Sequence, residues 1–226
     1  MIEEVDGILL AAHELKVPLA VIRQLAFALD ESSTHNQQIR TKIVSVSERA
    51  IRQVNDLAKI RRLEDGLFTM EPVAVREVCD AVSYELRQLF QYNSRDLHIK
   101  YKNKSKLVIA NRDLLCSIVY NFLINAMHYS GDGAKTEMIV NEVWDKTRIT
   151  VRDYGPALPM DIWREIKKGW MDKPTSIAMR PGSSGLGLYI ASSFSRYMNA
   201  KIGAVRHKDG TSFYVELITS KQASLF

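Results

Sequence analysis

The stretch NFLINAMHYS, Asn121–Ser130, decides the fold of the larger part of this chain. Its apolar residues are typical of a helix, and Asn125 follows Asn121 by four positions, while His128 and Tyr129 follow Asn125 by three and four. Residues at these spacings project from one face of a helix. The two carboxamides offer oxygen atoms to a hard cation and its waters, and the histidine is suited to contact a phosphate. A buried polar network is the plain structural alternative for the same side chains.

Two glycine-containing motifs follow this helix. In TVRDYGPALP, Thr150–Pro159, an alternating strand ends at Asp153, and Gly155 follows in a turn. A carboxylate fixed at a strand end accepts a hydrogen bond from an exocyclic amine such as that of adenine, and glycine lets backbone and water approach. In PGSSGLGLYIA, Pro181–Ala191, a glycine-rich turn opens onto a helix whose N-terminal amides attract a polyphosphate. Each motif alone is weak evidence, since glycine-rich turns are common.

Hydrophobic periodicity predicts an α/β sandwich around these motifs, with helices on one face of a mixed, mostly antiparallel sheet. We expect helices at residues 75–90, 112–129 and 186–198, strands at 98–102, 106–110, 137–144 and 148–153, and two more strands after residue 198. Between Gly155 and Gly185 lie about 30 residues, far more than the usual connection of ~4–6. This stretch is predicted to be an irregular, mobile lid.

The N-terminal part has the periodicity of a helical hairpin. Apolar residues from Val5 to Leu29 recur three and four positions apart, and a second series runs from Ile39 to Ile60. Two helices with one apolar stripe each cannot bury both stripes alone, so a dimeric four-helix bundle is the natural completion and we expect a homodimer. The predicted domains are residues 1–65 for the hairpin, 66–72 for a linker and 73–226 for the sandwich.

The motif HELKVPL, His13–Leu19, lies within the first apolar series. His13 directly follows the apolar residue Ala12, so we expect it on the flank of the bundle, where it is reachable from outside. Pro18 lies four residues after Glu14 and leaves the Glu14 carbonyl unpaired, a defect that costs roughly 3 kcal/mol in a regular helix interior. A solvated His–Glu pair is the plain alternative, but it gives no reason for the proline.

Composition excludes several classes of protein. The 226 residues are 46% apolar and 25% charged, as in ordinary globular proteins, and the apolar runs are too short to cross a bilayer. The acidic start MIEEVDG is unlike a signal peptide, so we expect a cytoplasmic protein, with any sensor or membrane anchor outside this chain. Cys79 and Cys116 lack CxxC spacing and fit a reducing compartment. The net charge of +5 comes from scattered basic residues, which disfavours nucleic acid as a partner.

The four motifs, in this order, resemble those of the sensor histidine kinases of two-component signalling. HELKVPL resembles their H box, NFLINAMHYS their N box, DYGPALP their first glycine box and GSSGLGL their second. The resemblance covers nearly the whole chain. It implies a dimerisation and phosphotransfer hairpin followed by an ATP-binding domain of the Bergerat type, which gyrase and the Hsp90 chaperone share.

The resemblance implies an ATP-dependent histidine autokinase that uses Mg²⁺. His13 would attack the γ-phosphorus with Glu14 hydrogen-bonded to its other ring nitrogen, and the phosphoryl group would pass to an aspartate in the receiver domain of a response regulator. Asp153 would read adenine. The other implied contacts are the magnesium ligands Asn121 and Asn125 and the residues around the phosphates and lid, His128, Tyr129, Gly155, Gly185, Leu186 and Gly187.

Four positions depart from the family pattern. Asn121 stands where related ATPases carry a water-activating glutamate, which favours transfer to histidine over hydrolysis. Val17 stands where a threonine or asparagine supports removal of phosphate from the regulator, so weak phosphatase activity is expected. His128 replaces a common lysine, which makes the phosphate contact depend on pH. Ala157 replaces the second glycine of the first glycine box, where the lid hinge is expected.

Three other functions compete with this interpretation. A relative that only hydrolyses ATP is disfavoured by Asn121 and by the H box. A catalytically inactive scaffold that dimerises and binds partners or nucleotide is disfavoured because His13, Glu14, Asn125 and Asp153 are all present. A DNA-binding module is disfavoured because no recognition-helix motif occurs.

Overall fold

The computed structural model describes residues 2–29, 36–102, 107–131, 133–168 and 185–220, with the backbone alone for residues 2–14, 161 and 165. The chain forms two compact units, the first mainly Met1–Arg62 and the second Leu63–Lys173 together with Gly187–Phe226. Among the described residues, no helix has the length and apolar character that a membrane crossing requires.

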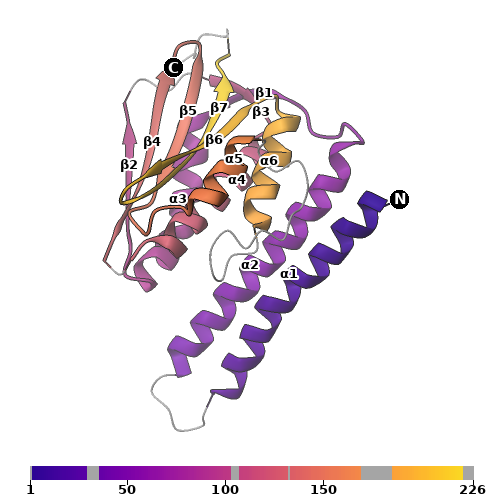
Figure 1. Cartoon of the computed structure of the whole chain (residues 1–226), viewed down its shortest axis with the longest axis vertical. Coiled ribbons are helices and arrows are strands. Elements are labelled where there is room, and N and C mark those ends of the chain that lie inside the picture. The colour runs from indigo at the N-terminus through magenta and orange to yellow at the C-terminus, as the bar shows by residue number, and fades with distance from the viewer. Residues whose placement is uncertain (1, 30–35, 103–106, 132, 169–184, 221–226) are drawn as a thin grey trace. The chain divides into compact units, whose positions relative to one another are not determined.

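The first unit is a helical hairpin. Helix α1 (Ile2–Phe27) and helix α2 (Asn36–Leu63) run in opposite directions (Figure 1). Pro18 lies inside α1, and the helix continues through it. The predicted hairpin is therefore confirmed, and the proline leaves the helix continuous.

The second unit is built on a five-stranded sheet of strand order β2-β4-β5-β7-β6 (Figure 1). Strand β2 runs parallel to β4, and the other neighbours are antiparallel, so the predicted mixed, mostly antiparallel sheet is confirmed. The strands are β2 (Asp96–Tyr101), β4 (Lys135–Val143), β5 (Lys146–Arg152), β6 (Lys201–His207) and β7 (Gly210–Ile218).

Helices cover one face of this sheet and form the core with it. They are α3 (Val75–Tyr92), α4 (Arg112–Tyr129), α5 (Met160–Lys168) and α6 (Leu186–Tyr197). Helix α4 is the central one: the side chain of Asn111 accepts a hydrogen bond from the Leu114 amide at 3.1 Å and caps its start. On its inner side, Phe122 stacks on Phe213 of β7 with ring centroids 5.9 Å apart. This packing fixes α4 against the middle of the sheet.

Two elements differ from the sequence-based expectation. Strand β1 (Glu71–Ala74) pairs antiparallel with β3 (Leu107–Ala110) in a separate two-stranded sheet. Glu71 and Pro72, which the sequence analysis places in the linker, are the first two residues of β1, so ordered pairing begins earlier than expected. A four-residue strand that depends on a distant partner carries little local signal.

Helix α5 is the second difference. It lies inside the stretch from Gly155 to Gly185 that the sequence analysis expects to be irregular. Its apolar residues Ile162 and Ile166 are buried and four positions apart, the spacing of one helix face. The remainder of the predicted lid, residues 169–184, lies outside the described residues.

Candidate functional site

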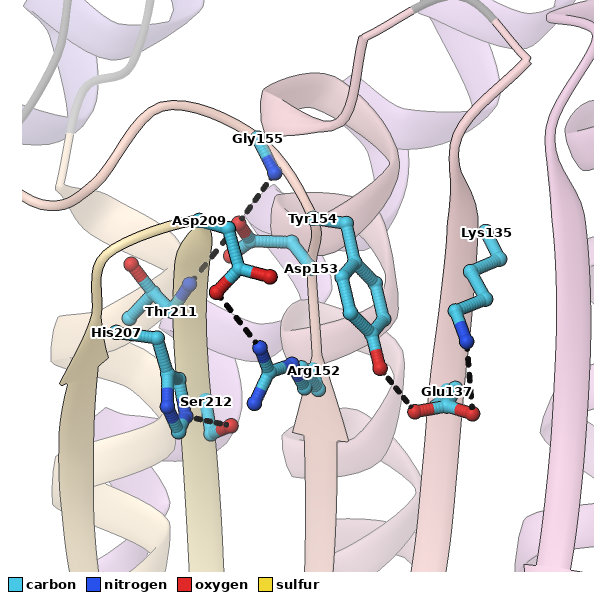
Figure 2. Close-up of polar contacts among 10 residues, drawn as sticks. All are labelled: Lys135, Glu137, Arg152, Asp153, Tyr154, Gly155, His207, Asp209, Thr211 and Ser212. Carbon is cyan, nitrogen blue, oxygen red and sulfur yellow. Dashed lines mark hydrogen bonds and ion pairs between the residues drawn. The ribbon is translucent and has the colours of Figure 1, made fainter.

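The site is organised around Asp153, which directly follows β5. Its side chain is buried, and Oδ1 accepts hydrogen bonds from the main-chain amides of Gly155 at 3.2 Å and Thr211 at 3.1 Å (Figure 2). The Asp153 amide in turn donates to the Thr211 carbonyl at 2.9 Å. The carboxylate is thus held by its own turn and by the start of β7. A carboxylate fixed in this way is an oriented acceptor for a ligand N–H group.

Gly155 brings the turn after Asp153 against the end of α4. A Cβ atom at Gly155 would lie 1.8 Å from the carbonyl oxygen of Tyr129 and 2.7 Å from its carbonyl carbon. Both are main-chain atoms, so only a residue without a Cβ fits at this distance. The first glycine box and the N box therefore meet here.

Gly187 brings the first turn of α6 against the middle of α4. A Cβ atom there would lie 2.8 Å from Oδ1 of Asn121. Asn121 is buried, and its Nδ2 donates to the carbonyl of Ser117 at 2.9 Å. Gly185, with a φ of +73°, precedes the buried Leu186, where α6 starts. The second glycine box therefore also packs on the N-box helix.

The remaining N-box residues differ in how accessible their side chains are to a ligand. Asn125 is half-buried, and within the described part of the chain its carboxamide makes no hydrogen bond. His128 is exposed and Tyr129 is half-buried. Among the described residues no group of three or more His, Cys, Asp or Glu side chains is arranged to hold a metal ion.

On the opposite face of the sheet, Tyr154 is fixed by a charged cluster (Figure 2). Its ring centroid lies 4.7 Å from Nζ of Lys135 and 4.5 Å from Cζ of Arg152, and its hydroxyl donates to Glu137. Glu137 also accepts from Lys100 at 2.7 Å. The hydrogen bonds from Lys100 and then Tyr154 lower the pKa of Glu137 to about 2, while burial and then Glu137 raise the pKa of Tyr154. This cluster holds the backbone next to Asp153.

The turn between β6 and β7 is tied down as well (Figure 2). Arg152 pairs with Asp209 at 2.9 Å, and a ring nitrogen of His207 lies 2.9 Å from Oγ of Ser212. Burial and then the charge of Arg152 lower the pKa of His207. These contacts fix the segment that carries Thr211.

Thr211 is not among the site residues expected from the sequence. It lies 58 positions after Asp153, so no local spacing relates the two residues. The available signal was the pair Asp209–Gly210, a turn sequence that directly precedes an alternating strand.

Comparisons with known proteins agree with this geometry. Residues 110–221 match the family described as histidine kinase-, DNA gyrase B-, and HSP90-like ATPase. The histidine protein kinase SaeS of Staphylococcus aureus is 27% identical over 214 residues, which cover 91% of this chain and 61% of SaeS. The chain belongs to the histidine kinases. The histidine kinase chain thus spans about 61% of the length of this curated relative.

Solved structures of histidine kinases share the fold over both units. Full-length ShkA in complex with AMPPNP matches with a TM-score of 0.62 at 19% identity, covering 96% of this histidine kinase chain and 46% of ShkA. ThkA in complex with the response regulator protein TrrA matches with a TM-score of 0.63 at 19% identity, covering 93% of this chain and 61% of that one. The predicted fold class, a helical hairpin followed by an α/β sandwich, is confirmed.

The H-box residues of the histidine kinase chain lie on the first unit. His13 and Glu14 are on α1, within the stretch whose backbone alone is described. Their side chains lie outside the described part, so their roles stay predictions.

Proposed function

We propose that this histidine kinase is an ATP-dependent autokinase that phosphorylates His13 and passes the phosphoryl group to an aspartate of a response regulator. The observation that carries the proposal is that three motifs far apart in the sequence converge on one helix. Gly155 packs on the end of α4 and holds Asp153, while Gly187 packs on its middle at Asn121. The same chain carries the H-box histidine on α1.

In the proposed reaction, Asp153 accepts a hydrogen bond from the adenine amine, and the first amides of α6 attract the phosphates. A nitrogen of His13 uses its lone pair to attack the γ-phosphorus. A P–N bond forms as the bond from the γ-phosphorus to the bridging oxygen breaks, and ADP leaves with that electron pair. The N–H of the other ring nitrogen stays hydrogen-bonded to Glu14, which orients the imidazole and makes it more nucleophilic.

The residues present fit a magnesium ion. The half-buried carboxamide of Asn125, without a protein hydrogen bond in the described part of the chain, offers the oxygen that a hard cation prefers. Asn121 is the second proposed ligand and the poorer one, because its Nδ2 is bonded to Ser117 and its Oδ1 faces Gly187. When bound, the ion would neutralise negative charge on the phosphates. His128 and Tyr129 are proposed to approach the same phosphates.

Label transfer from γ-labelled ATP tests the nucleophile. The wild-type protein should acquire acid-labile label, while His13→Gln should acquire none and still bind ATP, because the nucleotide site lies on the other unit. Asp153→Asn should lose both binding and label. If His13→Gln still incorporates acid-labile label, the nucleophile is misassigned. If the wild-type protein binds ATP with magnesium but transfers nothing, the inactive scaffold is the better description.

We also propose that the hairpin dimerises into a four-helix bundle. Apolar side chains remain exposed on both helices: Leu19 is 60% exposed, Phe27 84% and Ile51 61%. A second copy of the hairpin would bury these residues. Sedimentation should therefore show a dimer, and a stable monomer at micromolar concentration would overturn this part of the proposal.

The proposed phosphoryl acceptor is a receiver domain. The ThkA structure that matches both units is a complex with a response regulator protein, which supports the same class of partner here. Since the reaction consumes ATP, we place it in the cytoplasm. The phosphorylated protein should lose its label to a cognate receiver domain and keep it when the acceptor aspartate of that domain is changed to asparagine.

A further inference from the structure

Thr136, Asp153 and Thr211 form a row across three neighbouring strands on the helix-covered face of the sheet. Asp153 pairs with Thr211 through a main-chain hydrogen bond of 2.9 Å. On its other side, β4 and β5 are antiparallel with Glu137 opposite Arg152. The same register continued by one residue places Thr136 opposite Asp153. Cβ atoms of directly opposed residues lie about 4.5–5.5 Å apart.

The hydroxyl of Thr136 is buried and has no hydrogen-bond partner in the described part of the chain. The same holds for Oγ of Ser130, the residue that follows α4. Ser130 lies beside the turn after Asp153, because a Cβ at Gly155 would be 3.3 Å from its amide nitrogen. The two residues with unsatisfied hydroxyls therefore neighbour Asp153 or the turn that follows it.

Most buried hydroxyls elsewhere in this unit have a protein partner, and among the described residues Oγ of Ser83 on α3 is the exception. Oγ of Ser195 donates to the carbonyl of Ala191 at 2.7 Å, and Oγ1 of Thr147 lies 3.5 Å from Oγ1 of Thr219. A buried polar group without a partner destabilises the folded state and calls for a specific explanation. At a nucleotide site the explanation is a bound ligand that completes the hydrogen bonds.

We propose that Thr136 and Ser130 are base-recognition residues whose hydroxyls hydrogen-bond a 6-aminopurine held at Asp153, directly or through one ordered water. This inference rests on the proposed function, since it requires ATP to bind with its base at Asp153. The carboxylate accepts one hydrogen of the adenine amine. The second amine hydrogen and the ring nitrogens N1 and N7 are left to be paired. A hydroxyl both donates and accepts, so it can serve either group.

The test compares ATP affinity with the stability of the nucleotide-free protein. Thr136→Val and Ser130→Ala should each weaken ATP binding in calorimetry about fivefold, the worth of one ordinary hydrogen bond. Thr136→Val should also leave the thermal midpoint of the free protein unchanged or raise it, because it replaces an unsatisfied hydroxyl by a methyl group of the same shape. Thr136→Ser, which keeps the hydroxyl, should retain the wild-type affinity.

Thr147→Val is the matched control, since it removes a buried threonine hydroxyl that has a protein partner. It should lower the thermal midpoint and leave ATP affinity unchanged. Wild-type affinity in Thr136→Val and Ser130→Ala would overturn this inference and leave the proposed function standing. Absence of ATP binding by the wild-type protein would overturn both.

Discussion

Replacing Gly155 by alanine should separate the turn after Asp153 from the end of α4. The new Cβ would lie 1.8 Å from the carbonyl oxygen of Tyr129 and 2.7 Å from its carbonyl carbon. Neither atom belongs to a side chain that could rotate away. The turn and the helix end must therefore move apart by about 1.2 Å to restore even a 3.0 Å contact.

Two terms set the expected loss of stability. Overpacking of this kind costs about 1–3 kcal/mol. The shift also strains the hydrogen bond from the Gly155 amide to Oδ1 of Asp153, now 3.2 Å, and a hydrogen bond to a charged group is worth about 1.5–3 kcal/mol. A combined loss of about 3 kcal/mol lowers the thermal midpoint of the second unit by about 6–12 °C.

Thermal unfolding and ATP titration are the assays, and Gly131→Ala is the control. Gly131 lies near the same helix end, but a Cβ there would meet nothing within 4 Å. Gly131→Ala should match the wild-type protein in midpoint and affinity. Gly155→Ala should lose stability and ATP affinity together, because the displaced turn carries the carboxylate. A Gly155→Ala protein with wild-type midpoint and affinity would refute the close packing of turn and helix as the element that shapes the site.

Two further predictions concern stability. Trp144 is 96% exposed and has a φ of +59°, a backbone conformation that disfavours bulky residues and suits asparagine. Trp144→Asn should therefore raise the free energy of unfolding in urea by about 0.5–1 kcal/mol. A loss of stability would show that the indole makes a favourable contact. The pKa of Glu137 is lowered from 4.5 to about 2, so its contribution to stability is present above pH 4.5 and is lost as the pH falls towards 2. Glu137→Gln should therefore flatten the dependence of the unfolding free energy on pH in this window, and an equal slope in both proteins would contradict the assignment.

Local signals in the sequence were sufficient for the central elements. Helix α4 is observed at Arg112–Tyr129, as expected, because a capping residue precedes a run of apolar residues and the C-terminal polar residues end it. Strands β4 and β5 each begin two residues before their predicted start and end one residue before their predicted end. Helix α5 also had a local signal, because Pro159 is followed by Ile162 and Ile166 at helical spacing. The signal is short compared with the roughly 30 residues between Gly155 and Gly185, which were expected to be irregular throughout.

The site was only partly predictable, because neighbours in space decide what identical residue types do. Asn121 and Asn125 are indistinguishable by spacing, yet packing against Gly187 and a bond to Ser117 engage the first and leave the second available. Thr211 enters the site only because β7 lies beside β5.

The hold on Asp153 has a consequence for inhibitors that compete at this site. Two of the groups that orient its Oδ1 are main-chain amides, from Gly155 and Thr211. A side-chain substitution can neither remove these donors nor change their chemistry. To disturb these two bonds, a mutation that confers resistance to a compound hydrogen-bonded to Asp153 must alter the carboxylate or displace the backbone. Either change should weaken ATP binding as well, so few substitutions at this contact would confer resistance and keep the kinase active.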